Sequence, residues 1–214
     1  PSVVLSRISL AKNQLLSPTS YSANREYTMQ DRFARMPEVS RIYTEYNRRL
    51  KACNAMDFDD LLFMTNTLFK KNEVVLRKYQ DIFRYILVDE YQDTNYSQYL
   101  IIKRLAEPEN TICVVGDDAQ SIYSFRGANI ENILTFQKGY ADAKLFKLER
   151  NYRSTQTIVN AANSLIRHNR GQIPKAVYSE LALGDRLQLS NYMSDRDEGK
   201  AVAQQVKLLH RQGY

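Results

Sequence analysis

The sequence has few residues that support disulfide or multi-ligand metal chemistry. It contains two cysteines and two histidines. Cys53 and Cys113 each lie within an apolar pattern, so we expect neither a disulfide framework nor a zinc cluster. No apolar run approaches the roughly 18 residues of a membrane-spanning helix, and the first residues show no secretion signal. These absences favour a reducing interior, and we expect a cytoplasmic location and no membrane partner.

The sequence also has no internal repeat, no low-complexity tract and no Gly-x-x-x-x-Gly-Lys-Ser/Thr loop, the usual cradle for nucleotide phosphates. It does have enough apolar content to bury a core. Of its 214 residues 43% are hydrophobic, which fits one large domain or two small ones. Thirty Lys and Arg against 24 Asp and Glu give a formal net charge of +6. That surplus favours a polyanionic partner such as nucleic acid, although a solvated basic surface explains it equally well.

Hydrophobic spacing predicts helices first and a sheet later. Residues 1–54 are predicted to be helical, with Pro37 suited to a first helical turn. Further helices are predicted from Asp57, over 74–83, after a cap at Ser154 or Thr155, and opened by Asp195 or Asp197. Short apolar runs then alternate with helix-like stretches, as in a covered parallel sheet. The predicted strands are Tyr85–Val88, Thr111–Val115, Lys144–Leu148 and Arg186–Leu189, and residues 168–184 are predicted to be a loop.

Adjacent carboxylates follow two of the predicted strands. Asp89 and Glu90 come directly after the first, and Asp117 and Asp118 follow Gly116, which we expect to let the backbone turn sharply. Ligands of an open parallel sheet lie beyond the carboxyl ends of its strands. One carboxylate there can hold Mg²⁺ while its neighbour orients the attacking water, the division of labour that phosphoryl transfer requires. The alternative is that strand-end acids only cap the next helix.

An amide, two aromatic rings and a guanidinium follow the second pair of acids. Gln120 could hydrogen-bond a terminal phosphate or its water, and Arg126 could meet a phosphate. Tyr123 and Phe125 offer flat faces on which bases can stack, a contact worth roughly 1 to 3 kcal/mol per base. The alternative for the two rings is packing in the core or at an interface.

A third group lies between the third predicted strand and the helix that follows it. The ring of Tyr152 could stack on an adenine, and the guanidinium of Arg153 could neutralise charge that develops on a transferred phosphate. The alternative is a surface arginine in an ordinary connection between a strand and a helix.

Three stretches together resemble, in order and approximate spacing, motifs II, III and IV of the UvrD, PcrA and Rep type superfamily 1A DNA helicases: residues 86–95, 116–128 and 148–155. Residues 54–62 are similar to the family's re-entry into its first motor domain, and residues 8–21 and 34–37 to its helical 1B insertion. The resemblance implies an α/β fold. It would contain part of a RecA-like P-loop NTPase motor domain, with a parallel sheet and flanking helices, a helical 1B segment, and the start of a second RecA-like domain. The implied boundaries are 1–54 for the 1B segment, 55–145 for domain 1A and 146–214 for domain 2A.

The resemblance implies an ATP-driven motor that moves 3′ to 5′ along single-stranded DNA. Its cofactors would be ATP and Mg²⁺. By motif position, Asp89 would bind Mg²⁺, Glu90 would be the general base, and Gln120 would contact the γ-phosphate and couple it to DNA. Arg153 would reach that phosphate from the second motor domain, and Tyr152 would stack on the adenine.

The resemblance also implies a DNA-binding group. Tyr123 and Phe125 would be the base-stacking pair, with Arg126 beside them. Single-stranded DNA and its junctions with duplex would be the partners, together with proteins of DNA repair or replication. Many family members carry Trp in place of Phe125, and a smaller face should weaken stacking without abolishing it. Arg150 stands where Gln is frequent, a change that we do not expect to disturb these roles.

The family's phosphate-binding loop and its motifs V and VI have no counterpart within these 214 residues. We expect them before residue 1 and after residue 214. Without the Lys and backbone amides of the loop, the γ-phosphate loses its main cradle, so the polypeptide alone is predicted to have no appreciable ATPase activity. One alternative is a non-catalytic nucleic-acid-binding module of a helicase-like protein. Another is a metal-dependent nuclease that uses five acids: Asp89, Glu90, Asp93, Asp117 and Asp118.

Overall fold

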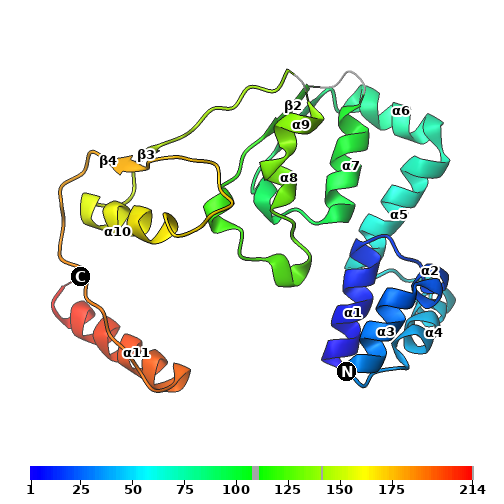
Figure 1. Cartoon of the computed structure of the whole chain (residues 1–214), viewed down its shortest axis with the longest axis horizontal. Coiled ribbons are helices and arrows are strands. Elements are labelled where there is room, and N and C mark those ends of the chain that lie inside the picture. The colour runs from blue at the N-terminus through cyan, green and yellow to red at the C-terminus, as the bar shows by residue number, and fades with distance from the viewer. Residues whose placement is uncertain (108–110, 141, 214) are drawn as a thin grey trace. The chain divides into compact units, whose positions relative to one another are not determined.

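The computed structural model of the chain describes residues 1–107, 111–140 and 142–213 (Figure 1). The chain forms two compact units. The first comprises residues 1–145 together with 171–173, and the second comprises residues 146–170 and 174–214. Within the described ranges, no helix is both long enough and apolar enough to cross a membrane.

The first unit begins with four helices around a small aromatic core: α1 (Ser2–Asn13), α2 (Pro18–Ala23), α3 (Arg25–Phe33) and α4 (Val39–Ala52). Tyr21 and Tyr43 are buried and meet edge to face, with ring centroids 5.9 Å apart. The other members of the buried cluster are Ile8, Ala11 and Val39. The helical prediction for this part of the chain is therefore confirmed. Pro37, however, precedes α4 and does not start it, because Glu38 is the N-cap.

Three further helices lead from this cluster to the sheet of the first unit (Figure 1): α5 (Phe58–Lys71), α6 (Glu73–Ile82) and α7 (Tyr96–Ala106). Helix α5 begins after Asp57, as predicted. Asp57 and Asp60 form a capping box, in which each carboxylate accepts the backbone amide of the other residue. Helix α5 packs against both α1 and α7. The contact with α7 is fixed by Asn66, whose Nδ2 donates to Ser97 O and Oγ at 2.9 Å each.

The first unit contains the parallel strand pairing that the sequence predicts. Strands β1 (Tyr85–Val88) and β2 (Thr111–Val114) pair in parallel, from Tyr85 opposite Thr111 to Val88 opposite Val114. Two short helices follow β2: α8 (Glu131–Leu134) and α9 (Phe136–Gly139). Tyr85 and Leu87 are 76% and 79% exposed. In the part of the chain that the structure describes, the sheet is thus covered on one face only, unlike the covered sheet that was expected.

Two of the predicted strands are not strands. Lys144–Leu148 and Arg186–Leu189 have irregular backbone. The second unit instead pairs β3 (Arg150–Asn151) with β4 (Tyr178–Ser179) in parallel, and β4 lies inside the segment predicted to be a loop. The apolar side chains of both incorrectly predicted segments are exposed, as Leu148 and Leu189 illustrate. Among the described residues, neither apolar run pairs with a strand.

Two helices complete the second unit, and both begin where the sequence predicts: α10 (Gln156–Ile166) and α11 (Asp195–Arg211). Thr155 is the N-cap of α10, but its side chain makes no capping hydrogen bond. The N-cap of α11 is Ser194, whose hydroxyl accepts the Asp197 amide at 3.2 Å. Acidic side chains then occupy the first turn of α11, where they complement the helix dipole.

Candidate functional site

The acids after β1 lie on a strained turn. Asp89 and Glu90 are both exposed. Glu90 has φ 50° and ψ 40°, a left-handed conformation that residues other than glycine rarely adopt. Its amide donates to Asp89 Oδ1 at 2.9 Å, and Tyr91 N donates to Val115 O at 3.0 Å, which ties the turn to the end of β2. Such strain persists only where the surroundings enforce it, and it is common at functional sites.

A buried glutamine joins the two strand ends. Gln92 lies in the short helix η1 (Tyr91–Asp93) and is 1% exposed. Its Nε2 donates to Glu90 Oε2 at 2.7 Å, and its Oε1 accepts from Asp117 N at 3.0 Å. The NH₂ group of the amide therefore bonds to the turn after β1, and its oxygen bonds to the turn after β2. Sequence reasoning gave this residue no role, and its position soon after two acids was the only available signal.

The two acids after β2 have different partners. Asp117 Oδ2 accepts from Gln120 Nε2 at 2.8 Å, and its Oδ1 accepts from Ala119 N at 3.0 Å, at the start of η2 (Asp118–Gln120). Asp118 is buried, and its Oδ2 accepts from Ile173 N at 2.7 Å within the same unit. Asp117 thus both caps η2 and orients Gln120, whereas Asp118 anchors a backbone segment.

Gly116 is required for close packing. Its φ lies outside the left-handed region, so its backbone conformation does not by itself demand glycine. An added Cβ would lie 2.5 Å from Gln92 Oε1 and 2.9 Å from Ile133 Cδ1. Real Cβ atoms essentially never approach other atoms so closely, so any side chain at this position would displace Gln92 or Ile133.

The two rings predicted to stack on bases lie next to each other. Tyr123 and Phe125 have ring centroids 6.0 Å apart and planes inclined at 42°, with Phe125 in η3 (Ser124–Arg126). Phe125 is 76% exposed and Tyr123 is 38% exposed, so neither is part of a buried core in this chain. The side chain of Arg126, predicted to lie beside them, is outside the described residues.

The segment that carries these rings is fixed to the residues after the first acid pair. Asn132 Nδ2 donates to Thr94 O at 3.0 Å and to Thr94 Oγ1 at 3.1 Å. Asn95 forms an antiparallel bridge with Ala128, and its Nδ2 donates to Asn13 Oδ1 of α1 at 2.8 Å. Hydrogen bonds therefore connect the ring segment to the turn after β1 and to the first helix.

The predicted residues of the second unit lie on one exposed turn. Tyr152 and Arg153 both have exposed side chains. Asn151 orders the turn, because its Oδ1 accepts from Arg153 N at 2.9 Å and from Ser154 N at 2.7 Å. The guanidinium of Arg150 lies over the Tyr152 ring, 4.7 Å from its centroid. Arg150, which stands where Gln is frequent and was not expected to disturb the proposed roles, thus contacts one face of the ring.

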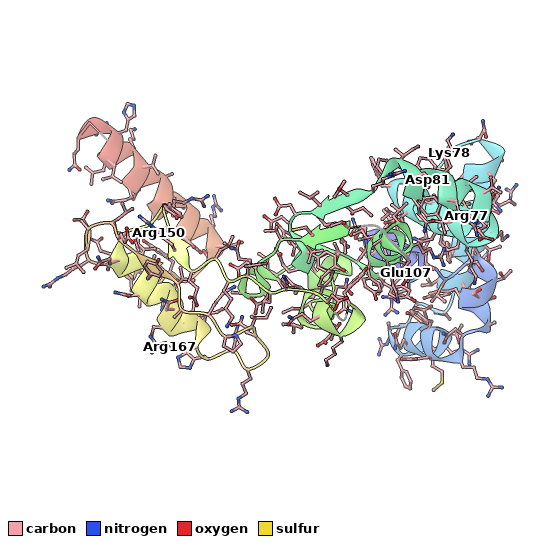
Figure 2. The ribbon with its side chains drawn as sticks, turned by 90° about the horizontal axis from the view of Figure 1, so that it is seen from above. Arg77, Lys78, Asp81, Glu107, Arg150 and Arg167 are labelled. Atoms are coloured by element: carbon pink, nitrogen blue, oxygen red, sulfur yellow. The ribbon has the colours of Figure 1, made fainter. Side chains whose placement is uncertain are left out.

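A cavity of about 820 Å³ lies at the other end of β1 and β2. Its lining includes Tyr85 and Thr111, the first residues of the two strands, so it is remote from the strand-end acids. Arg77, Asp81 and Glu107 come to it from α6 and from the end of α7 (Figure 2). Acidic and basic side chains are equally numerous in its lining. The cavity therefore has no formal charge to attract a phosphate, and it contains none of the predicted site residues.

The strand-end turns fit a site for one divalent cation. Asp89 presents an exposed carboxylate whose described contact is the adjacent amide of Glu90. Mg²⁺ is commonly held by one or two carboxylates together with substrate phosphates and water, so Asp89 is a suitable ligand. Among the residues with described positions, no three His, Cys, Asp or Glu side chains are grouped to hold a metal ion. The acids therefore do not form the multi-carboxylate cluster that the nuclease alternative requires.

The fold and the site define an α/β protein with acids at the carboxyl ends of two parallel strands of its first unit and with Tyr152 and Arg153 on an exposed turn of its second unit. Residues 3–141 match the family model of the UvrD/REP helicase N-terminal domain, and residues 146–214 match that of the UvrD-like helicase C-terminal domain. The chain belongs to the UvrD-like helicase family.

Similar proteins include several named ATP-dependent DNA helicase PcrA. The one from Leuconostoc citreum is 41% identical over 209 residues, which are 98% of this chain and 27% of the relative. Those from Staphylococcus epidermidis strain RP62A and Staphylococcus aureus strain COL are each 43% identical over 213 residues, which are 100% of this chain and 28% of the relative. The chain thus spans little more than a quarter of the length of these curated relatives.

Proposed function

We propose that this chain is part of an ATP-dependent DNA helicase that moves 3′ to 5′ along single-stranded DNA in repair or replication. Family membership and the shared name of the relatives support ATP and DNA as its ligands. The observation that carries the proposal is a series of hydrogen bonds through Glu90, Gln92, Asp117 and Gln120. The series links the proposed general base to the amide proposed to contact the γ-phosphate, which supports joint action in phosphoryl transfer.

In this proposal Glu90 accepts a proton from the attacking water. Gln120 hydrogen-bonds the γ-phosphate and couples it to DNA. The exposure of both side chains supports access to a ligand. Asp89 would hold Mg²⁺, which when bound neutralises charge on the phosphate oxygens. Tyr123 and Phe125 stack on bases of the single strand, a role that their adjacent, exposed rings support.

For the second unit we propose that Arg153 contacts the γ-phosphate and that Tyr152 stacks on the adenine. The exposure of both side chains supports these roles. The RecA-like character of domains 1A and 2A, the helical 1B segment and their boundaries belong to the same proposal. One parallel strand pair in each unit supports two motor domains.

The distribution of charge along the chain supports DNA as a partner. Residues 1–54 carry nine Lys and Arg against four Asp and Glu, and residues 146–214 carry eleven against six. Residues 55–145, which include the strand-end acids, carry ten against fourteen. The positive surplus therefore lies at the two ends of the chain, where it can meet the phosphates of a single strand or of a junction with duplex.

The proposal is tested by ATP hydrolysis in the whole protein that contains this chain, with and without single-stranded DNA. Glu90→Gln is compared with wild type and with Glu131→Gln, a change at an exposed acid of α8. We expect DNA-stimulated hydrolysis in wild type and the control, and a loss of about 10² to 10⁴ in kcat in Glu90→Gln. Undiminished hydrolysis in Glu90→Gln would contradict the proposal. DNA binding without hydrolysis in wild type would favour the non-catalytic module.

We further propose that residues 1–214 alone do not hydrolyse ATP appreciably. The reason is that the sequence contains no glycine-rich phosphate loop with its Lys. The test compares ATP hydrolysis by the purified polypeptide and by its Glu90→Gln variant. Hydrolysis above background that depends on Glu90 would contradict this proposal and leave the assignment of the general base intact.

A further inference from the structure

We propose that Gln92 is a positioning residue, which aligns the Glu90 carboxylate and makes that alignment depend on Gln120. This inference rests on the proposed function, because it matters only if Glu90 is the base. Among the described residues, the hydrogen bond from Gln92 Nε2 at 2.7 Å is the one that the Glu90 side chain accepts. It fixes Oε2 and leaves Oε1 for the proton of the attacking water.

The chemistry of the neighbours determines which way the Gln92 amide points. The Asp117 backbone N–H can only donate, so it requires the carbonyl oxygen Oε1, at 3.0 Å. The Glu90 carboxylate can only accept, so it requires the NH₂ group. A glutamine meets both demands in one orientation. A glutamate would meet only the first, and a methionine would meet neither.

Packing prevents the amide from moving independently of the two turns. Gln92 is 1% exposed, and Gly116 leaves no more than the space that Oε1 occupies. The backbone carbonyl of Gln92 also accepts from Ser121 Oγ at 3.4 Å, which holds the main chain of this residue against the same segment. A shift of the turn after β2 must therefore move the Gln92 amide, and with it the hydrogen bond to Glu90.

Gln120 lies at the other end of the same series of contacts. Its Nε2 donates to Asp117 Oδ2 at 2.8 Å, and the amide of Asp117 donates to Gln92. When the Gln120 amide moves from Asp117 to a γ-phosphate, the turn that holds Gln92 loses this contact. The Gln92 amide would then shift and carry the Glu90 carboxylate with it, so the position of the proposed base would respond to engagement of the nucleotide by Gln120. Gln92 thereby couples recognition of the phosphate to activation of water.

The decisive substitution in the whole protein is Gln92→Glu. It preserves side-chain size and the acceptor for Asp117 N–H, but removes the donor to Glu90. The matched control is Asn66→Asp, the same change from amide to carboxylate at a side chain that is 2% exposed and bonds to Ser97 between α5 and α7. Because a positioned base contributes about 10² to 10⁴, we expect Gln92→Glu to lower kcat about tenfold or more. The KM for ATP and the affinity for single-stranded DNA should stay within about twofold of wild type, since the Gln92 side chain is buried.

A buried carboxylate could itself cause misfolding, so a second pair of variants separates that effect from the loss of the hydrogen bond. Gln92→Met removes the donor to Glu90 and also the acceptor for Asp117 N–H, and Asn66→Leu removes the donor to Ser97, in both cases without adding charge. Circular dichroism and thermal unfolding report the folded fraction. The inference predicts reduced kcat at unchanged KM in both folded Gln92 variants and unchanged kcat per folded molecule in both Asn66 variants. The inference is wrong if the folded Gln92 variants retain the kcat of wild type. It is also wrong if the fall in their activity only matches the fall in the folded fraction. Full activity of Glu90→Gln in the same assay would instead overturn the proposed function, and this inference with it.

Discussion

The guanidinium of Arg150 lies over the ring of Tyr152, with Cζ 4.7 Å from the ring centroid. The same guanidinium pairs with Glu180, the residue that follows β4. Arg150 is therefore held at two points, and it supports one face of the ring. The opposite face is the one on which an adenine would stack.

We expect Arg150→Gln to weaken adenine-nucleotide binding, because the ring would lose its support. An exposed cation–π contact contributes about 0.5 to 1 kcal/mol, so the Kd of a fluorescent ATP analogue for the whole protein should rise about two- to fivefold. Glu180→Gln is the control, since it removes the ion pair but leaves the guanidinium over the ring. Tighter binding in Arg150→Gln would show that the guanidinium obstructs the ring.

A methyl group at position 116 should disturb the site, because it would lie 2.5 Å from Gln92 Oε1. The Gln92 amide is held on both sides, so it cannot turn away without losing a hydrogen bond. We expect Gly116→Ala to lower the free energy of unfolding by about 1 to 3 kcal/mol, as overpacking usually does. Gly139→Ala is the control, because an added Cβ there meets nothing within 4 Å. Equal urea midpoints for the two variants would refute the packing argument.

Affinity for single-stranded DNA should depend on the adjacent rings. Removing a stacking ring costs about 1 to 3 kcal/mol per base, so Tyr123→Ala and Phe125→Ala should each weaken binding by about fivefold or more in fluorescence anisotropy. Phe125→Trp should strengthen it, because indole offers a larger face. Phe58→Ala, which removes an exposed ring from α5, should have no effect. If the two ring variants bind as wild type does, stacking is not their role.

Local patterns in the sequence predicted part of each unit. The apolar run before Asp89 gave the bounds of β1 correctly, apolar spacing gave the start of α5, and candidate capping residues gave the starts of α10 and α11. These features depend on residues close together in the chain. The pairing of β3 with β4 was missed because it depends on contacts between distant residues, such as that from Ser179 Oγ to Ser154 O.

In the candidate site, too, contacts between residues distant in the sequence could not be predicted from local patterns. Motif positions pointed to Glu90 and Gln120 as separate candidates, but not to the side chains between them. The contact of Gln92 with Asp117 joins residues 25 positions apart, and it depends on the register of β1 with β2. The steric role of Gly116 arises from the same approach of two turns. Neither could be read from local spacing, because the pairing of the strands creates both.

The buried cation of α1 offers a test of stability in the first unit. Lys12 is 1% exposed, and its Nζ lies 2.7 Å from Asp57 Oδ2 and 2.8 Å from Asp60 Oδ1. Lys12→Met would leave two carboxylates without their counter-ion, and removing one partner of a buried pair typically costs about 3 to 5 kcal/mol. Glu45→Gln, which removes exposed pairs with Arg48 and Arg49, should cost far less, because exposed ion pairs contribute little. Urea unfolding of the two variants distinguishes these outcomes.

The same substitution should change the response to acid. Burial raises the pKa of Asp57, but hydrogen bonds from Lys12, the Asp60 amide and Tyr46 outweigh burial and hold that pKa below its ordinary value. The resulting stabilisation is complete above the ordinary Asp pKa of about 3.9, and it is lost as the pH falls through the lower pKa of the folded state. In Lys12→Met the largest opposing contact is gone while burial remains, so unfolding should begin at a higher pH than in wild type. Unfolding followed by circular dichroism during acid titration measures this shift, and coincident acid midpoints would show that Lys12 does not hold the pKa of Asp57 down.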